Sequence, residues 1–330
     1  MTVAPPQHRR RVGSLEVLLI GLIALAVSAG AVSAFVAGDP DVSTAATVFC
    51  GVFVQALPFL VLGVVVSGLI AAFVSAERLS RWLPRRPALA VLAAGIGGAA
   101  LPGCECGSVP VARRLFGPGT NGAAALTFML SAPAVNPVVL VATSVAFPSQ
   151  PAVVLARCVA SLITAMVMGL LWSRFGRDEW VTRALPAPAT EASSRWTVFT
   201  EAARHDFLQA ASYLVVGAGA AAALHVLVPP WVFEHLAGHL LLGVVTMALL
   251  AVVLALCSEA DAFVAASLTM VPLVPRLVFL VVGPAFDVKL SAMQAGMFGR
   301  RFAVRFGPAT LLVATVVATV VGLAVLGGAT

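Results

Sequence analysis

Five apolar runs, each long enough to cross a lipid bilayer, constrain this chain more than any other feature. They lie at residues 15–37, 44–75, 151–173, 207–228 and 308–328. A helix needs about 20 residues to cross the hydrocarbon core. Lipid offers the backbone no hydrogen-bond partner, so each run is predicted to be a helix. Only 10% of the 330 residues are charged, which argues against a soluble enzyme, a disordered chain and a nucleic-acid binder.

The remaining apolar segments are interrupted by residues that break helices. Residues 88–101 are short and glycine-rich and lead into LPGCECGSVP, while 119–147 are cut by SAPAVNP. The region 240–298 is broken at CSEAD, VPLVP and GPAFD. At membrane depth, broken helices are tolerated only where they face protein or a water-filled cavity. In transporters they mark the binding site, so we expect the site at these breaks.

The arginines predict how the chain is oriented. Seventeen of the 19 arginines fall in five stretches, at residues 9–11, 78–86, 113–114, 174–204 and 300–305. Cytoplasmic loops are enriched in arginine and lysine, and one topology places all five stretches inside. It has seven full spans and two re-entrant hairpins, the first formed by residues 88–116. The N-terminus is then cytoplasmic and the C-terminus external.

Three pairs of segments indicate an internal repeat. FVQALPFLVLG (53–63) resembles FLQAASYLVVG (207–217), LPGCECGSVPVARRL (101–115) resembles LALCSEADAFVAASL (254–268), and PAVN (133–136) resembles PAFD (284–287). The three offsets lie between 151 and 154 residues, and their order is kept, which chance similarity between apolar helices rarely produces.

The repeat divides the chain into four parts. These are an N-terminal tail with the first transmembrane helix (1–43), repeat 1 (44–173), a cytoplasmic linker (174–206) and repeat 2 (207–330). The distribution of the arginines predicts that the two repeats have opposite orientations in the membrane. The predicted fold is therefore an all-α polytopic membrane protein, an inverted repeat with broken helices and a site at the midplane between the halves.

The segment PGCECG (102–107) carries the strongest chemical signal. Residues two apart on an α-helix point about 200° apart, whereas on an extended backbone they share a face. Proline and glycine favour an unwound backbone here, so Cys104 and Cys106 are predicted to converge while Glu105 points away. Two converging thiols suit a soft ion such as Cu(I), Zn(II) or trivalent arsenic. The alternative is a pair of buried structural cysteines.

The matching segment in the second half contains Cys257, Glu259 and Asp261. Cys257 aligns with Cys104, and Glu259 aligns with Cys106. Carboxylates at membrane depth are costly and are functional candidates, so a proton held at Glu259 or Asp261 could be exchanged for a cation. The predicted metal ligands are Cys104, Cys106, Cys257 and Glu259, and the proton-coupling residues are Glu259, Asp261 and Glu105. The alternative is that the two acids reach external water and are solvated.

Asn136 and Asp287 occupy equivalent places, where each broken helix begins again. There they can cap the free N–H groups of the second half-helix, and contact with the substrate is expected in addition. Lys289, the only lysine of the chain, either pairs with Asp287 or snorkels to the interface. Arg157 lies within a span, where it is expected to snorkel or pair.

Other residues are weaker candidates. Methionines are more often packing residues than thioether ligands, which concerns Met129, Met270, Met293 and Met297. Three histidines flank the external loop 229–239, namely His225, His235 and His239. A metal site there is the less favoured interpretation. The chain has no G-x-S-x-G motif and no Walker loop, so it is expected to be a transporter and not an enzyme.

LPGCECGSVPVARRL, followed by TFMLSAPAVNP, resembles the bacterial predicted-permease family that includes organoarsenical efflux permeases of the ArsP type. CSEADAFVAASL and GPAFDVKL also resemble that family's pattern, and the resemblance covers roughly residues 45–325. It implies efflux across the inner membrane. Many members carry serine between the two cysteines, where this chain has Glu105. The charged residue indicates a distinct branch, in which a monovalent or divalent metal is at least as well expected as an arsenical.

The favoured function is proton-coupled efflux of a thiophilic metal or metalloid by an inner-membrane permease. Its substrate site is expected to include Cys104, Cys106, Cys257, Asn136 and Asp287. Three alternatives remain open: metal uptake or small-anion transport, a membrane thiol oxidoreductase that uses the C-x-C pair, and a metal-binding scaffold or sensor without flux. Expected partners are membrane lipid and the transported ion, with a homo-oligomer or an accessory metal-handling protein left open. No cofactor and no nucleic acid are expected.

Overall fold

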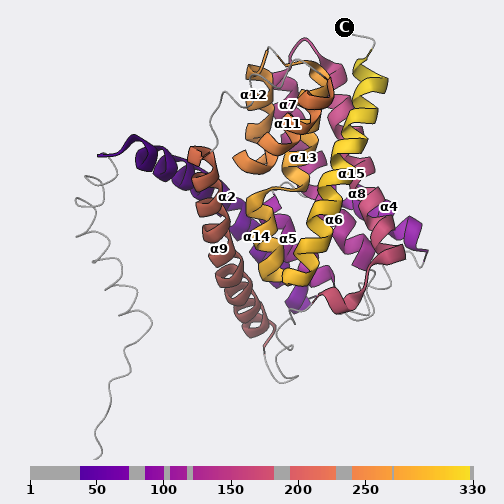
Figure 1. Ribbon diagram of the computed structural model, residues 1–330. Helices are drawn as coiled ribbons and strands as arrows, with labels where there is room; N and C mark the ends of the chain where they lie inside the picture. The colour runs from indigo at the N-terminus through magenta and orange to yellow at the C-terminus, as the bar shows by residue number, and fades with distance from the viewer. Residues whose placement is uncertain are drawn as a thin grey trace, which may run out of the picture.

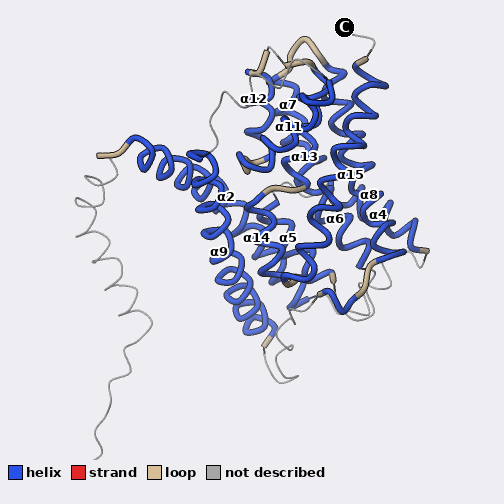
Figure 2. Tube along the Cα trace, in the orientation of Figure 1, coloured by secondary structure: helices blue, strands red, loops and turns tan. Residues whose placement is uncertain are grey.

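The computed structural model describes residues 38–73, 86–99, 105–116, 122–181, 194–227, 240–269 and 271–327. These residues form helices joined by short loops, and this part of the chain contains no strand (Figure 2). The all-helical fold class is confirmed there. The expected first span at 15–37, the arginines at 9–11, Cys104, Met270, His235 and His239 lie outside the described residues.

The first half contains six described helices. They are α2 (Pro40–Phe73), α4 (Pro87–Ala99), α5 (Glu105–Leu115), α6 (Gly122–Val135), α7 (Pro137–Ala146) and α8 (Pro151–Phe175). A short 3-10 helix, η1 (Asp178–Trp180), follows.

The second half repeats the succession of helix lengths. It consists of α9 (Arg195–Leu227), α11 (Leu240–Leu254), α12 (Ser258–Ser267), α13 (Leu273–Ala285), α14 (Val288–Met297) and α15 (Arg300–Leu326). Helix α9 begins at Arg195, well before the residue 207 at which the span was expected to start. The last part of the expected linker is therefore helical.

Four helical segments of the described chain are long and apolar enough to cross a membrane. They are Pro40–Phe73, Gly122–Ala146, Pro151–Phe175 and Arg300–Leu326, with mean hydropathies between 1.8 and 2.5. On α15, Leu312, Val316 and Val320 are each more than half exposed. Aliphatic side chains exposed along a long helix face lipid in a membrane protein.

Two pairs of long helices run antiparallel. The end of α2 lies against the beginning of α9, because Arg195 stacks over the Phe73 ring at 5.9 Å and Gly68 faces Phe199. In the same way, Trp172 near the end of α8 packs against Phe302 near the beginning of α15, with ring centroids 5.4 Å apart. The pair α2 and α9 forms one side of the molecule, and α8 and α15 lie on the other (Figure 1).

The helix breaks fall where the sequence predicted them. Helix α6 gives way to α7 at Asn136, whose side-chain oxygen accepts from the Val139 N–H at 3.0 Å. Helix α13 gives way to α14 before Asp287, whose carboxylate accepts from the Leu290 N–H at 2.5 Å. Both capping roles are confirmed. The breaks lie inside the bundle, with α7 and α12 toward the C-terminal end of the molecule and α5 and α14 toward the opposite end (Figure 1).

Candidate functional site

The beginnings of α5 and α12 meet inside the protein. Ser258, the first residue of α12, donates its hydroxyl to Glu105 Oε2 at 3.4 Å, and Glu105 is the first residue of α5. The two side chains are at most 1% exposed. The matched segments around Glu105 and Ser258 therefore come together, although 153 residues separate them.

Lys289 brings a third segment to this junction. Its ammonium donates to Glu105 Oε1 at 2.5 Å, lies 3.9 Å from Asp287 Oδ2 and approaches the Leu256 carbonyl at 3.5 Å. The lysine side chain is fully buried. The snorkelling alternative is therefore wrong. The expected contact with Asp287 exists, but it is longer than the contact with Glu105.

The backbone at the first helix start differs from the sequence expectation. Helix α5 already includes Glu105 and Cys106, so the extended backbone expected through residues 104–106 is wrong from Glu105 onward. An acidic residue in the first turn stabilises a helix by interacting with its dipole. Glu105 also contacts Ser258 and Lys289 in the second half of the chain, so its carboxylate belongs to the junction.

Two of the predicted sulfur ligands lie beside the junction. Cys106 and Cys257 are at most 1% exposed and belong to one buried cluster that also contains Met129 and Met293. Cys106 directly follows Glu105 in α5, and Cys257 is the N-cap of α12, directly before Ser258. Within the described ranges, no group of three or more histidine, cysteine, aspartate or glutamate side chains is gathered for a metal ion. Cys106, Cys257 and Glu259 lie within these ranges and do not form such a group, and Cys104 lies outside them, so the four-ligand site stays a prediction.

The acidic side chains of α12 are less well satisfied than Glu105. Neither carboxylate oxygen of Glu259, nor Oδ2 of Asp261, has a hydrogen-bond partner among the described residues, although all three atoms are buried. Asp261 lies directly against Gly283, where an added Cβ would be only 2.5 Å from Oδ2. A side chain at position 283 would thus displace the carboxylate.

Arg157 supplies the second cation of this region. It is fully buried and donates to Thr143 Oγ1 at 2.6 Å and to the Ser258 carbonyl at 2.8 Å. It therefore pairs inside the bundle instead of snorkelling. Its guanidinium interacts electrostatically with Glu259 and Asp261, but its hydrogen bonds to Thr143 and Ser258 go to neutral groups.

We call this group the junction cluster, and it consists of Glu105, Arg157, Glu259, Asp261, Asp287 and Lys289. Four carboxyl groups and two cations interact with one another. When all six are ionised, the cluster has a formal excess of two negative charges. An uncompensated negative charge in a buried site favours protons or a cationic ligand over an anion.

Glycines allow the helices that carry the cluster to approach α2 and α9 closely. A Cβ on Gly63 of α2 would lie 2.4 Å from the Cα of Gly107, two residues after Glu105. A Cβ on Gly217 of α9 would lie 2.7 Å from the Cα of Lys289 itself. Backbone lies against backbone at both places, so the positions of Glu105 and Lys289 are fixed by direct helix contact.

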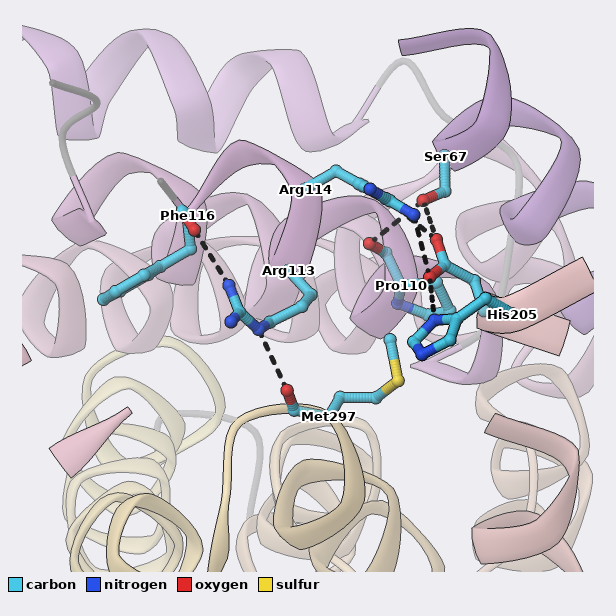
Figure 3. A network of polar contacts seen from close by, with 8 residues as sticks. Ser67, Pro110, Arg113, Arg114, Phe116, His205 and Met297 are labelled. Carbon is cyan, nitrogen blue, oxygen red and sulfur yellow. Dashed lines mark hydrogen bonds and ion pairs between the residues drawn. The ribbon is translucent and has the colours of Figure 1, made fainter. Parts of the chain in front are cut away.

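A second buried ion pair holds the other end of α5. Asp206 of α9 is fully buried, and both of its oxygens accept from Arg114, each at 3.0 Å. Ser67 of α2 donates to Asp206 at 2.7 Å, and the half-exposed ring of His205 lies 3.3 Å away. Figure 3 shows Arg114, Ser67 and His205 gathered around this carboxylate. We call these four residues the Asp206 network.

Arg113 fixes α5 to α14 beside this network. Its Nε donates to the Met297 carbonyl at 2.9 Å and its Nη1 to the Phe116 carbonyl at 2.9 Å (Figure 3). Carbonyls at the end of α14 and of α5 are thereby satisfied. The sequence indicates only that Arg113 and Arg114 orient the chain in the membrane, whereas in the structure both also make internal contacts.

Apolar helices of membrane-spanning length, broken around buried charges, define a multi-pass membrane protein of the transporter class. The family model described as "Predicted permease" matches residues 41–325. The chain belongs to this predicted-permease family, which confirms the resemblance seen in the sequence.

Two curated relatives are similar over most of the chain. The "UPF0718 protein YcgR" of Bacillus subtilis is 34% identical over 263 residues, which cover 78% of this chain and 89% of the relative. A "Putative two-component membrane permease complex subunit" of Streptococcus mutans is 29% identical over 283 residues, or 83% of this chain and 94% of the relative. No solved structure matches the chain.

Proposed function

We propose that this permease exports a thiophilic metal or metalloid cation through the junction of α5 and α12 by secondary transport. One observation supports this most strongly: Cys106 and Cys257, from the two matched segments, are buried beside Glu105 and Ser258, where four carboxyl groups and two cations lie. Thiolates bind soft ions, and once the carboxyl groups release their protons their negative charges favour a cation. Cys104, directly before Glu105 in the chain, would provide the third sulfur.

Glu259 and Asp261 carry the coupling proton in this proposal. Both carboxylate oxygens of Glu259 and Oδ2 of Asp261 are buried and have no hydrogen-bond partner among the described residues, so they can accept a proton. A proton on either group neutralises charge in the substrate-free state, and its release restores an acceptor for the incoming cation. Transport would then be driven by the proton gradient, with one group exchanging a proton for metal in each cycle.

The architecture in this proposal is an inverted repeat with seven spans and two re-entrant hairpins, α4–α5 and α11–α12. The matching succession of helix lengths supports the repeat. The antiparallel pairs α2–α9 and α8–α15 support the inversion. The two repeats are not packed identically: α2 packs on α5, whereas its counterpart α9 packs on α14 and not on α12, the counterpart of α5. The proposed division keeps 44–173 and 207–330 as the two repeats, with the N-terminus cytoplasmic and the C-terminus outside the inner membrane.

Asn136 and Asp287 cap α7 and α14 at the two matching helix breaks. Asp287 Oδ2 has no hydrogen bond among the described residues and lies 3.9 Å from the Lys289 ammonium. We include both side chains in the substrate path, in addition to their capping roles. The junction cluster has four carboxyl groups and two cations, so once it is fully ionised it disfavours a small anion.

An accessory subunit belongs to the proposal as well. The relative from Streptococcus mutans carries the words "complex subunit" in its name. A partner protein that receives or delivers the metal is consistent with a family member working in a complex.

Flux into proteoliposomes tests the proposed function. Cd²⁺ serves as the soft probe ion, and transport by the full chain is compared with Cys106→Ala and Cys257→Ala. Cys50→Ala is the matched control, because Cys50 is exposed on α2. We expect uptake driven by an imposed pH gradient in the parent and the control, and loss of uptake in the two junction variants. Equal uptake by all four proteins would falsify the assignment of the thiols.

A further inference from the structure

Lys289 places a buried positive charge at the junction of α5 and α12. The ammonium is the only charged donor hydrogen-bonded to Glu105 in the described chain, and the contact is 2.5 Å long. It therefore occupies the place beside Cys106 and Cys257 where a transported cation would be expected. A fixed ammonium and an incoming metal ion repel each other strongly in a medium of low dielectric constant.

The structure also provides a second position for the ammonium. Asp287 Oδ2 is buried, makes no hydrogen bond within the described residues and lies 3.9 Å from Lys289 Nζ. Both residues belong to the start of α14, so rotation of the lysine side chain can move the ammonium from the Glu105 carboxylate to the Asp287 carboxylate. The Leu256 carbonyl, 3.5 Å from Nζ, flanks the same region. The ammonium can therefore leave Glu105 without losing all its partners or its proton.

The surrounding contacts make the lysine side chain the movable part. Gly217 packs directly on the Lys289 backbone, and Gly63 packs on the backbone beside Glu105. Asp287 is held as the cap of α14. Backbones and carboxylates are thus fixed, whereas the four-carbon stem of a lysine has several rotatable bonds.

We propose that Lys289 is a tethered competitor of the transported cation. Its ammonium neutralises Glu105 while the site is empty, and it moves to Asp287 when a metal cation binds Glu105 and the neighbouring thiols. The exchange keeps the charge of the empty site low, and the returning ammonium helps to expel the bound cation. This inference rests on the proposed function and adds to it a residue that determines affinity and release.

Binding of Cd²⁺ to the full chain in lipid nanodiscs tests the exchange. Lys289→Met removes the competitor at similar length, so we expect Cd²⁺ to bind at least about tenfold more tightly than to the parent. Release should become slower, which lowers flux. Arg305→Met is the matched control, because it removes an exposed cation outside the junction cluster, and its affinity should equal that of the parent.

A second measurement leaves the junction intact. Lys289 is the only lysine, so lysine labelled with ¹³C and ¹⁵N gives a single side-chain signal. We expect saturating Cd²⁺ to shift this signal, and Glu105→Gln to shift it in the absence of metal. This measurement decides the matter if Lys289→Met does not fold. The double variant Glu105→Gln with Lys289→Met removes both charges and controls for an unpaired Glu105.

The results of these experiments distinguish failure of the competitor role of Lys289 from failure of the proposed transport function. If the parent binds Cd²⁺ through its thiols, but Lys289→Met binds no more tightly and the lysine signal does not move, the tethered competitor is wrong and the proposed function stands. If neither the parent nor Lys289→Met binds Cd²⁺, the proposed function fails and the inference fails with it.

Discussion

Two buried ion pairs hold α5, and they differ in how completely their neighbours are satisfied. At one end of the helix, Asp206 accepts two hydrogen bonds from Arg114 and one from Ser67. At the other end, Glu105 pairs with Lys289, yet the nearby carboxylates of Glu259 and Asp261 retain buried oxygens without partners among the described residues. Both carboxylate oxygens of the first pair have hydrogen-bond partners, whereas the second pair lies in a cluster where several buried carboxylate oxygens have none among the described residues.

The difference separates a structural contact from a functional one. Removing one member of a saturated buried pair leaves an uncompensated charge and costs stability. Buried acceptors without partners cost stability in the resting state, and such groups gather at functional sites. The Asp206 network should therefore govern folding, and the junction cluster should govern transport.

Asp206→Ala is expected to have the largest effect on stability. It strands the Arg114 guanidinium inside the protein, which should lower the free energy of unfolding by about 3–5 kcal/mol. Thermal unfolding in detergent measures the loss. Arg305→Ala, which removes an exposed arginine, is the control and should change little. A loss no greater than the control would show that this pair does not hold α5.

Gly63→Ala should come next, because a Cβ at this position would overlap the backbone of Gly107. Overpacking of this kind costs about 1–3 kcal/mol, and the displaced α5 should also weaken transport. Gly51→Ala on the same helix is the matched control, since its Cβ would meet no atom within 4 Å. Equal stabilities of the two variants would contradict the close contact between α2 and α5.

Asp287 allows the cap and the charge to be tested separately. Asp287→Ala removes the cap and should cost about 0.5–2 kcal/mol, as should Asn136→Ala at the matching break. Asp287→Asn keeps an acceptor oxygen for the Leu290 N–H and should preserve stability while lowering flux. Unfolding and proteoliposome flux measured on the same preparations decide this. Unchanged flux in Asp287→Asn would remove Asp287 from the substrate path.

Glu259→Gln should have the smallest effect on stability, because its carboxylate oxygens make no hydrogen bond in the described structure. We expect unfolding within about 0.5 kcal/mol of the parent and loss of flux driven by a pH gradient. Metal binding at a fixed pH should weaken but persist, because the thiols of Cys106 and Cys257 remain. Flux that still follows the pH gradient would exclude Glu259 as the coupling residue.

Much of the fold could be predicted from the sequence because local chemistry determines it. Apolar runs of sufficient length form helices, and Asn136 before Pro137 ends one helix and caps the next. Prolines and glycines predicted the breaks because both residues disfavour a continuous helix. The observed helix ranges differ from the predicted ones mainly where polar residues extend a helix beyond its apolar run, as at the start of α9.

The pairing within the candidate site could not be derived from local sequence. Glu105 and Lys289 are 184 residues apart, and Arg114 and Asp206 are 92 apart. Only tertiary packing brings them together. A signal was nevertheless present: charges of opposite sign within apolar segments must find partners in lipid. Glu105, Arg157 and Lys289 could have been treated as one set on that ground, whereas Lys289 was matched only with its neighbour Asp287.

X-ray absorption at the cadmium edge tests the central claim, that thiols from both halves of the chain bind one soft cation. The experiment uses Cd²⁺ bound to the full protein and to Cys257→Ala, with Cys50→Ala as the control. We predict at least two sulfur neighbours in the parent and the control, and one sulfur fewer in Cys257→Ala. A metal surrounded only by oxygen and nitrogen, or an unchanged sulfur count in Cys257→Ala, would contradict a shared site at the junction of α5 and α12.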